Sequence, residues 1–251
     1  MKIVKQVCKY LLLTATLSVL VSCMSNNGAD DYKAPLTSND ANNYNGGVIQ
    51  VYAARTHGAK QALAVHTWVS VKKSNESQFT SYEIIGWKLR YQDTALAIRN
   101  SEPNRDWWGH SPELILDYRK PDADRVIDKI VQAVERYPHK DEYQVWPGPN
   151  SNTFTAYVGL QVPELGLDLP STAIGKDYRS LDGLVGLSPS GSGVQASIFG
   201  LLGLTVGIEE GLELNILGLS FELDLFDLAM ELPGVGRIGA APAVIETPQA
   251  D

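Results

Sequence analysis

Residues 62–71 read ALAVHTWVSV, residues 72–77 read KKSNES, and residues 79–87 read FTSYEIIGW. Two runs rich in β-branched and aromatic residues thus flank a short polar stretch, which is typical of two strands joined by a turn. Residues 48–52 (VIQVY) show the same strand pattern, and residues 91–99 predict a further strand. We therefore expect residues 48–99 to form an antiparallel meander.

Helical spacing begins after Pro121 and ends before Pro138. Its apolar positions are Val126, Ile127, Ile130, Val131 and Val134. A loop rich in proline and glycine follows at residues 145–152, and residues 153–162 predict a second, short helix that Pro163 ends. The expected fold class is α+β, with an antiparallel sheet packed against a few helices in one domain over residues 47–192.

Strict alternation returns near the C-terminus. Leu212, Leu214 and Ile216 alternate with polar residues, and after Gly218 the apolar residues change parity, which predicts a hairpin with one apolar and one acidic face. We expect residues 193–239 to form a β-hairpin extension that packs on the first domain. The alternative is a face that meets a membrane or a partner. Residues 240–251 predict a disordered tail, and residues 163–192 predict loops.

The first 22 residues predict a secretory signal peptide. Lys2, Lys5 and Lys9 precede an apolar run at residues 11–21, which is shorter than the roughly 20 residues that a spanning helix needs. The run ends in LVSC, which resembles the bacterial lipobox and implies lipidation of Cys23 after cleavage. The alternatives are an ordinary secretory signal or an uncleaved anchor helix. Residues 23–46 then predict a flexible tether. Ser25, two positions after Cys23, resembles the sorting pattern of bacterial lipoproteins, which implies the periplasmic side of the outer membrane in a Gram-negative cell.

Charge and cysteine content exclude several functions. Removing residues 1–22 removes three lysines and no acid, which leaves 18 basic and 29 acidic residues, a net charge of −11. Such an acidic chain disfavours nucleic acid as a partner. The mature chain has no cysteine besides Cys23, so a thiol nucleophile is excluded. No metal cluster, Walker loop or dinucleotide fingerprint occurs, and we expect no cofactor.

Ser151 and His66 are the candidate catalytic residues. Ser151 lies where the second helix is expected to begin, beside backbone N–H groups that can hold an oxyanion. A serine needs a general base, and His66 within an apolar strand is the best candidate, with Glu83 or Tyr82 on the next strand as the orienting group. The structural alternatives are a helix N-cap for Ser151, a core histidine for His66 and a surface charge for Glu83.

Two polar and two aromatic residues are candidates for the substrate groove. Asn150 and Asn152 flank Ser151, Trp146 lies in the preceding loop, and Trp108 belongs to the aromatic stretch WWGH at residues 107–110. Packing is the alternative role for the tryptophans.

Two resemblances add to these residues. The stretches VYAARTHG (51–58), AVHTWVSV (64–71), YEIIGW (82–87), DEYQVWPGPNSNTF (141–154), VPELGLDLPSTAIGKDY (162–178) and GLLGLTVGIEEGLELNILGL (200–219) resemble a bacterial family known only as domain of unknown function 3750. NSNTF (150–154) resembles the Asp-Cys-Ser-Gly-Phe segment of NlpC-type papain-like peptidases. Because His66 precedes Ser151, the order is similar to the circularly permuted, lecithin:retinol acyltransferase-like members. Serine stands where those proteins have cysteine, which leaves both a serine enzyme and an inactive protein open.

Two classes of function follow. In the first, the chain is a serine hydrolase or acyltransferase acting on amide or ester bonds of envelope peptides or lipids. In the second, it is an inactive envelope binding or assembly module that holds a peptide, glycan or protein partner.

Overall fold

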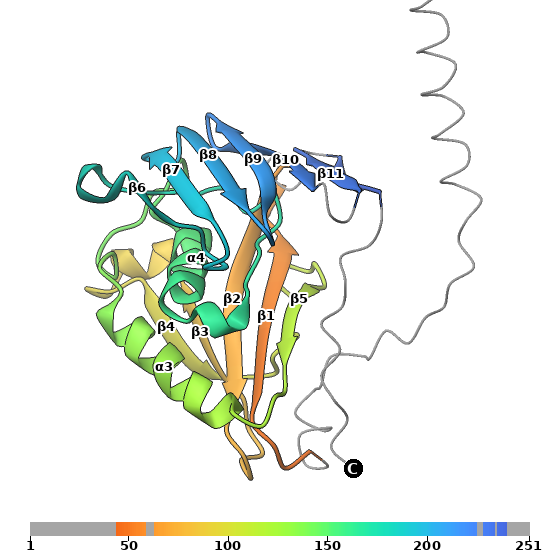
Figure 1. The fold of residues 1–251 in the computed structure, drawn as a ribbon. Helices are drawn as coiled ribbons and strands as arrows, with labels where there is room; N and C mark the ends of the chain where they lie inside the picture. The colour runs from red at the N-terminus through yellow and green to blue at the C-terminus, as the bar shows by residue number, and fades with distance from the viewer. Residues whose placement is uncertain (1–43, 59–62, 225–227, 234, 240–251) are drawn as a thin grey trace, which may run out of the picture. The chain divides into compact units, whose positions relative to one another are not determined.

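The computed structural model of the chain describes residues 44–58, 63–224, 228–233 and 235–239. The predicted signal peptide, most of the predicted tether and the tail at 240–251 lie outside these residues. The described part is α+β and mostly sheet, with two antiparallel sheets and two α-helices (Figure 1). Within this part, no helix combines the length and the apolar character that crossing a bilayer requires.

The first sheet contains the predicted meander. Its strand order is β4-β3-β2-β1-β5, and every neighbouring pair is antiparallel. The strands are β1 (Val48–Arg55), β2 (Val65–Lys72), β3 (Thr80–Ile84), β4 (Leu96–Asn100) and β5 (Glu113–Tyr118). The predicted strand at 79–87 is shorter than expected, because its end forms the 3₁₀ helix η2 (Gly86–Arg90). The predicted strand at 91–99 begins later, at Leu96.

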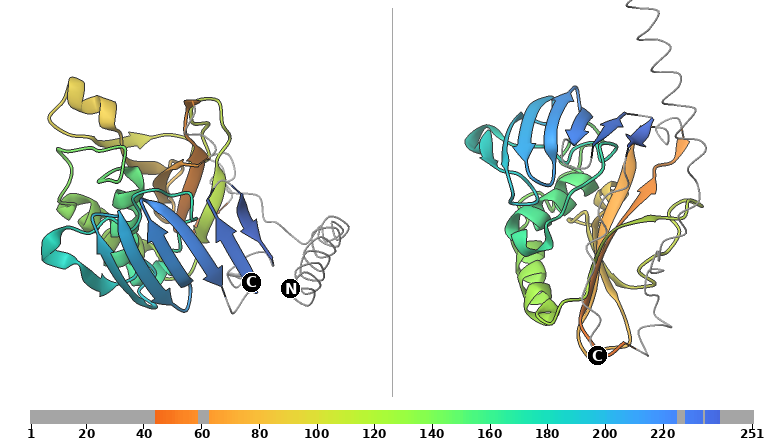
Figure 2. Two further views of the ribbon diagram at one scale, coloured as in Figure 1. Left: turned by 90° about the horizontal axis from the view of Figure 1, so that it is seen from above. Right: turned by 45° about the vertical axis from the view of Figure 1, so that its right-hand side comes forward.

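Two helices cover one face of this sheet. They are α3 (Ala123–Arg136), which packs against β1 and α4, and α4 (Ser151–Gln161), which packs against β2 and β3 (Figure 2). The core lies between the helices and the sheet, where Val51, Val69, Ile130 and Phe154 are each fully buried. Alternate residues of a strand point to opposite faces, so the neighbours of these valines point away from the helices.

The second sheet has seven strands in the order β12-β11-β10-β9-β8-β7-β6. They are β6 (Val185–Leu187), β7 (Val194–Ile198), β8 (Leu202–Gly207), β9 (Gly211–Ile216), β10 (Leu219–Asp224), β11 (Ala229–Leu232) and β12 (Gly236–Ile238). The sheet lies beside α4, on the helix side of the first sheet (Figure 2). The stretch predicted as loops contains β6 as well as the 3₁₀ helices η3 (Pro163–Leu165) and η4 (Leu181–Gly183).

The second sheet turns its polar face inward. Gln195, Thr205, Glu213 and Glu222 pair across neighbouring strands, and none is more than 4% exposed. The hairpin predicted around Gly218 is present as β9 and β10, and its predicted apolar and acidic faces are present too. The buried face is the acidic one, and the apolar face is exposed.

Asp177 attaches the second sheet to the segment that follows α4. Its carboxylate accepts hydrogen bonds from Gln195 Nε2 at 2.7 Å, Asn215 Nδ2 at 2.6 Å and Ser220 Oγ at 3.1 Å, which belong to three strands. The adjacent Lys176 forms a buried ion pair with Glu213. Hydrogen bonds and charge therefore attach the polar face of this sheet to the segment that follows α4.

Candidate functional site

Helix α4 begins with an asparagine cap. Asn150 is extended, and its side-chain oxygen accepts hydrogen bonds from the backbone N–H groups of Asn152 at 2.9 Å and Thr153 at 3.2 Å. Thr153 Oγ1 accepts from the Asn150 N–H in return, which completes a capping box. The N-cap role considered for Ser151 therefore belongs to Asn150, and the helix starts two residues before the predicted start at 153.

Ser151 is the first residue of α4, and it is only 3% exposed. Its backbone carbonyl accepts a hydrogen bond from Thr67 Oγ1 at 3.4 Å, and Thr67 also bonds to Asn152 and Thr155. The Thr67 side chain therefore points from β2 toward α4. Ser151 thus packs against the helix-facing side of the sheet.

His66 points to the opposite face. It precedes Thr67 in β2, so its side chain leaves the strand on the side away from α4. The His66 ring contacts Trp68 and Trp107 on that side. No hydrogen bond joins Ser151 to His66 among the described residues, so the structure does not bring the predicted nucleophile and base together.

His66 and Glu83 do meet. His66 Nε2 lies 2.8 Å from Glu83 Oε2, and the Glu83 side chain is fully buried. Arg105 Nη2 donates to Glu83 Oε1 at 2.5 Å, and Arg99 Nη2 lies 3.1 Å from the same oxygen. Tyr82, the alternative orienting group, is part of the helix-facing core instead. Of the two predicted candidates, Glu83 is the one beside His66.

Burial and the neighbouring charges set the protonation states of this pair. Burial lowers the pKa of the His66 imidazole below its ordinary value, although Glu83 acts in the opposite direction. Burial also acts to raise the pKa of the Glu83 carboxyl, but the hydrogen bond from His66 and the charges of His66, Arg105 and Arg99 outweigh it and hold that pKa below its usual range. At neutral pH a neutral imidazole therefore donates from Nε2 to a carboxylate, which leaves Nδ1 unprotonated and able to accept.

A series of stacked aromatic rings extends outward from His66. Trp107 stacks on the His66 ring with centroids 3.8 Å apart, and Trp87 stacks on Trp107 at 5.6 Å. Trp108 meets Trp87 edge-on at 5.8 Å and stacks on His57 at 5.5 Å. Trp87 is 45% exposed and Trp108 60%, so the outer rings face solvent.

These rings border a pocket of about 340 Å³. It is lined by His66, Ile84, Ile85, Gly86, Trp87, Arg90, Trp107, Tyr143 and Val145. This volume lies at the lower end of the range for small-molecule sites, roughly 300–1,000 Å³. The lining also resembles such sites, because it is mostly apolar and aromatic with a few polar groups.

Gly86 and Arg90 shape this pocket. A Cβ on Gly86 would lie 2.3 Å from Cδ1 of the Tyr143 ring, so only glycine lets Tyr143 pack this closely. Arg90 is exposed, and it has no ion-pair partner among the described residues. Sequence reasoning missed both residues, because Gly86 was assigned to the strand predicted at 79–87 and Arg90 to the connection before residue 91.

The remaining predicted groove residues lie elsewhere. Asn152 Nδ2 donates to the carbonyls of Val65 at 3.1 Å and Ile174 at 2.8 Å, so it joins α4 to its surroundings. Trp146 Nε1 donates to the Leu217 carbonyl at 2.9 Å, which places this tryptophan against the second sheet. Of the predicted tryptophans, only Trp108 belongs to the aromatic series beside His66.

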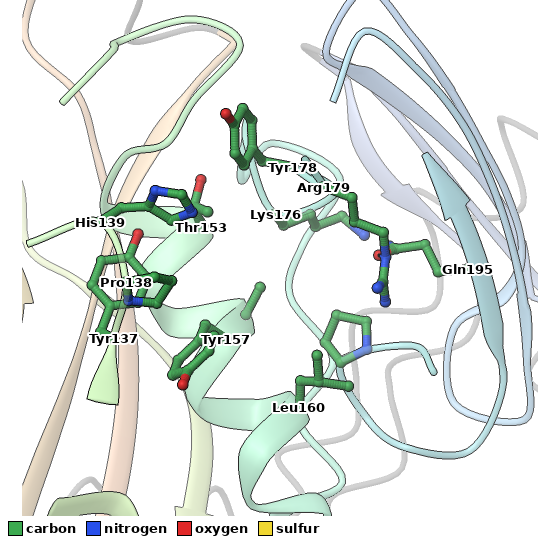
Figure 3. A pocket seen from close by; sticks show the side chains of 12 residues that line it. Tyr137, Pro138, His139, Thr153, Tyr157, Leu160, Lys176, Tyr178, Arg179 and Gln195 are labelled. Carbon is green, nitrogen blue, oxygen red and sulfur yellow. The ribbon is translucent and has the colours of Figure 1, made fainter. Parts of the chain in front are cut away.

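A second, smaller cavity of about 90 Å³ lies between α4 and β7 (Figure 3). Its polar side chains are engaged with the protein. Lys176 pairs with Glu213, and Arg179 Nε donates to Gln195 Oε1 at 2.8 Å. In addition, no group of three or more His, Cys, Asp or Glu residues within the described ranges is arranged to hold a metal ion. We therefore place the candidate site in the larger pocket beside His66.

Fold and site together define an α+β protein with an aromatic pocket beside the end of β3, which His66 and Trp107 border together with Ile84 and Tyr143 of the helix-facing core. A family described as "Protein of unknown function (DUF3750)" matches residues 46–178, which is more than half of the chain. The chain belongs to this family. The match covers the first sheet, both α-helices and Asp177, and it ends before the second sheet begins. No curated protein and no solved structure matches the chain.

Proposed function

We propose that the protein is a cell-envelope lipoprotein, tethered through lipid on Cys23, that binds an acidic glycan or glycopeptide in the pocket beside His66. The observation that supports this most directly is the aromatic wall of the pocket. Trp87, which is 45% exposed, offers a ring surface on which a sugar ring or a planar group can stack, and Trp107 holds it from behind. The sequence features of residues 1–23 support the tether, and Ser25 favours the outer membrane as its location.

Arg90 supports an anionic ligand. Its guanidinium is exposed at the pocket lining and has no ion-pair partner in the described part of the chain, so it can hold a carboxylate in bidentate geometry. Cell-wall glycopeptides carry both features, because their sugar rings bear peptide stems that end in free carboxylates. The overall negative charge of the chain does not oppose such binding, since Arg90 acts at short range.

A binding module agrees with the geometry better than a serine enzyme does. A serine nucleophile needs a base within hydrogen-bond reach, and Ser151 and His66 lie on opposite faces of β2. Two features agree with the predicted permuted papain-like core. Helix α4 begins at the NSNTF segment, and His66 lies on a strand that α4 packs against. That likeness remains a prediction, and the binding proposal does not depend on it.

Calorimetric titration of the purified chain with soluble muropeptides tests the proposal. We expect binding that Trp87→Ala and Arg90→Ala each weaken by at least about tenfold, as central contact residues do. Tyr91→Ala and Arg136→Ala are the matched controls, because both side chains are exposed and neither lines the pocket. Binding that the pocket variants leave unchanged would contradict the proposed site. Muropeptide cleavage that Ser151→Ala abolishes would instead restore the enzyme hypothesis.

A further inference from the structure

The outward face of the second sheet is apolar along its whole width. One row of side chains crosses all seven strands, and its members are between 40% and 56% exposed. The row consists of Leu187, Val194, Val206, Leu212, Leu223, Met230 and Ile238. A surface this regular differs from the single exposed apolar residues that soluble proteins normally show.

Two further rows lie beside it. The second row is Val185, Ala196, Leu204, Leu214 and Phe221, and the third is Ile198, Leu202, Ile216 and Leu219. None of these side chains carries a charge or a hydrogen-bonding group. With strands about 4.8 Å apart, the rows form a flat area on the order of 500 Å², as large as the largest apolar patches on typical monomers. We name these three rows the apolar face.

We propose that the apolar face lies against the acyl region of an uncharged lipid surface. This inference uses the membrane tether of the proposed function, but it concerns a different surface from the pocket. Strands β7 to β11 each have a hydrogen-bonded neighbour on both sides, so the central part of the face needs no polar partner. A protein interface usually includes arginine, aromatic and polar rim residues, whereas this face is almost entirely aliphatic.

The turns of the sheet support a lipid occupant. Ile208, Leu217 and Val235 lie in hairpin turns, Leu228 lies directly before β11, and all four are 60–83% exposed. A protein partner that fitted the apolar face would cover the strands and leave the turns exposed to water. A lipid surface would cover the strands and the apolar turns together. Trp146 lies beside Leu217 and is 51% exposed, a placement common for tryptophan at the border between membrane and water.

The chain between the lipid site and the domain permits this contact. From Cys23 to Tyr44, the first described residue, it can span up to about 70 Å when extended. The domain can therefore turn the apolar face toward the membrane that holds the acyl chains. Because the mature chain is strongly acidic, the surface that fits best is zwitterionic rather than anionic.

Quenching by spin-labelled lipids tests the inference on the full-length, mature chain. Lipidation consumes the Cys23 thiol, so an introduced cysteine is the only one available for a fluorophore. We place it at Leu204→Cys on the apolar face and, as the matched control, at Ile98→Cys on β4, since these positions are 48% and 59% exposed. In phosphatidylcholine vesicles with doxyl-labelled chains, we expect at least a twofold stronger quenching at 204 than at 98, without dependence on salt.

A second variant separates the face from the tether. With the fluorophore at Leu228→Cys, adding Leu204→Glu and Leu214→Glu should abolish the quenching, while mass spectrometry still finds acylated Cys23. Equal quenching at positions 204 and 98 on an acylated chain overturns the inference and leaves the tether intact. Excimer emission between pyrene labels at 204 on two molecules also overturns it, because a second copy then covers the face. A chain without acyl groups refutes the tether. Because its Cys23 thiol is then free, Cys23→Ser is added, and quenching at 204 in added vesicles still decides the face.

Discussion

Replacing Glu83 by glutamine is expected to destabilise the protein strongly. Glu83→Gln keeps the volume of the side chain but removes the negative charge between His66, Arg105 and Arg99. The Arg105 side chain is only 16% exposed, and its guanidinium lies 4.5 Å from the centroid of the Trp68 ring. It therefore has little access to water once its counter-charge is lost.

The expected loss follows from these exposures. Removing one partner of a buried ion pair typically costs about 3–5 kcal/mol. The contact with Arg99 adds little, about 0–1 kcal/mol, because that side chain is 40% exposed and can turn to water. The glutamine oxygen can still accept from His66 Nε2, so we expect about 3 kcal/mol in total.

Urea unfolding measures this loss. The midpoint should fall at an unchanged slope, and the melting temperature should fall by about 6–12 °C for a chain of this size. Glu135→Gln, on the exposed side of α3, is the matched control and should change stability by less than about 0.5 kcal/mol. In an Arg105→Gln background the cost of Glu83→Gln should shrink by about 1–3 kcal/mol. A loss below about 1 kcal/mol, or the same loss in both backgrounds, would refute the assigned role of the pair.

Three other changes test separate parts of the structure. Ser151→Ala should alter stability by less than about 1 kcal/mol and leave muropeptide affinity unchanged, because no described side chain bonds to its hydroxyl; a loss of ligand binding in calorimetry would contradict this. Asn150→Ala should cost about 2–4 kcal/mol in urea unfolding, since it removes the cap and leaves the carbonyls of Val145 and Ile174 without this donor, whereas Asn150→Asp should retain the cap. Burial raises the pKa of Glu222 to about 8, above its unfolded value of 4.5, so its contribution to stability is present below pH 4.5 and is lost as the pH rises toward 8. Glu222→Gln should therefore stabilise the protein by about 1–2 kcal/mol at pH 8 and change little at pH 5; an equal effect at both values would show that titration of this carboxyl is not the cause.

The sequence predicted the meander, helix α3 and the β9–β10 hairpin because each has a strong period of its own. It did not reveal β5, whose six residues ELILDY contain an apolar run without clear alternation and gain their place by pairing with β1. It also could not show which face of the second sheet is buried. Apolar and polar residues alternate with the same period whether the apolar or the polar face is buried. Only tertiary contacts, such as the hydrogen bonds of Asp177, determine which face is buried.

The candidate site was predicted in part. Pairing of adjacent strands predicted that Glu83 comes close to His66, and the structure places them 2.8 Å apart. Whether Ser151 could meet His66 depended on which face of β2 is covered by α4, and the sequence does not show this. Thr67, one residue away, is the side chain that meets α4, so a shift of a single residue separates the two candidates. The pocket itself depends on the close packing of Tyr143 against η2. Only the absence of a side chain at Gly86 permits this packing, and the sequence pattern gives no other sign of it.

The second sheet buries its polar face and exposes its apolar face, and this arrangement affects the heat capacity change of unfolding. The heat capacity change of unfolding increases with the apolar area that becomes exposed and decreases with the polar area. In this sheet the leucines, valines and isoleucines are already in contact with solvent in the folded chain, whereas carboxylates, amides and hydroxyls become hydrated on unfolding. The described strands of this sheet should therefore contribute much less to the heat capacity change than the usual value of about 12–15 cal/mol/K per residue. The chain without lipid should show a flatter stability curve than its length suggests, with a smaller loss of stability on cooling.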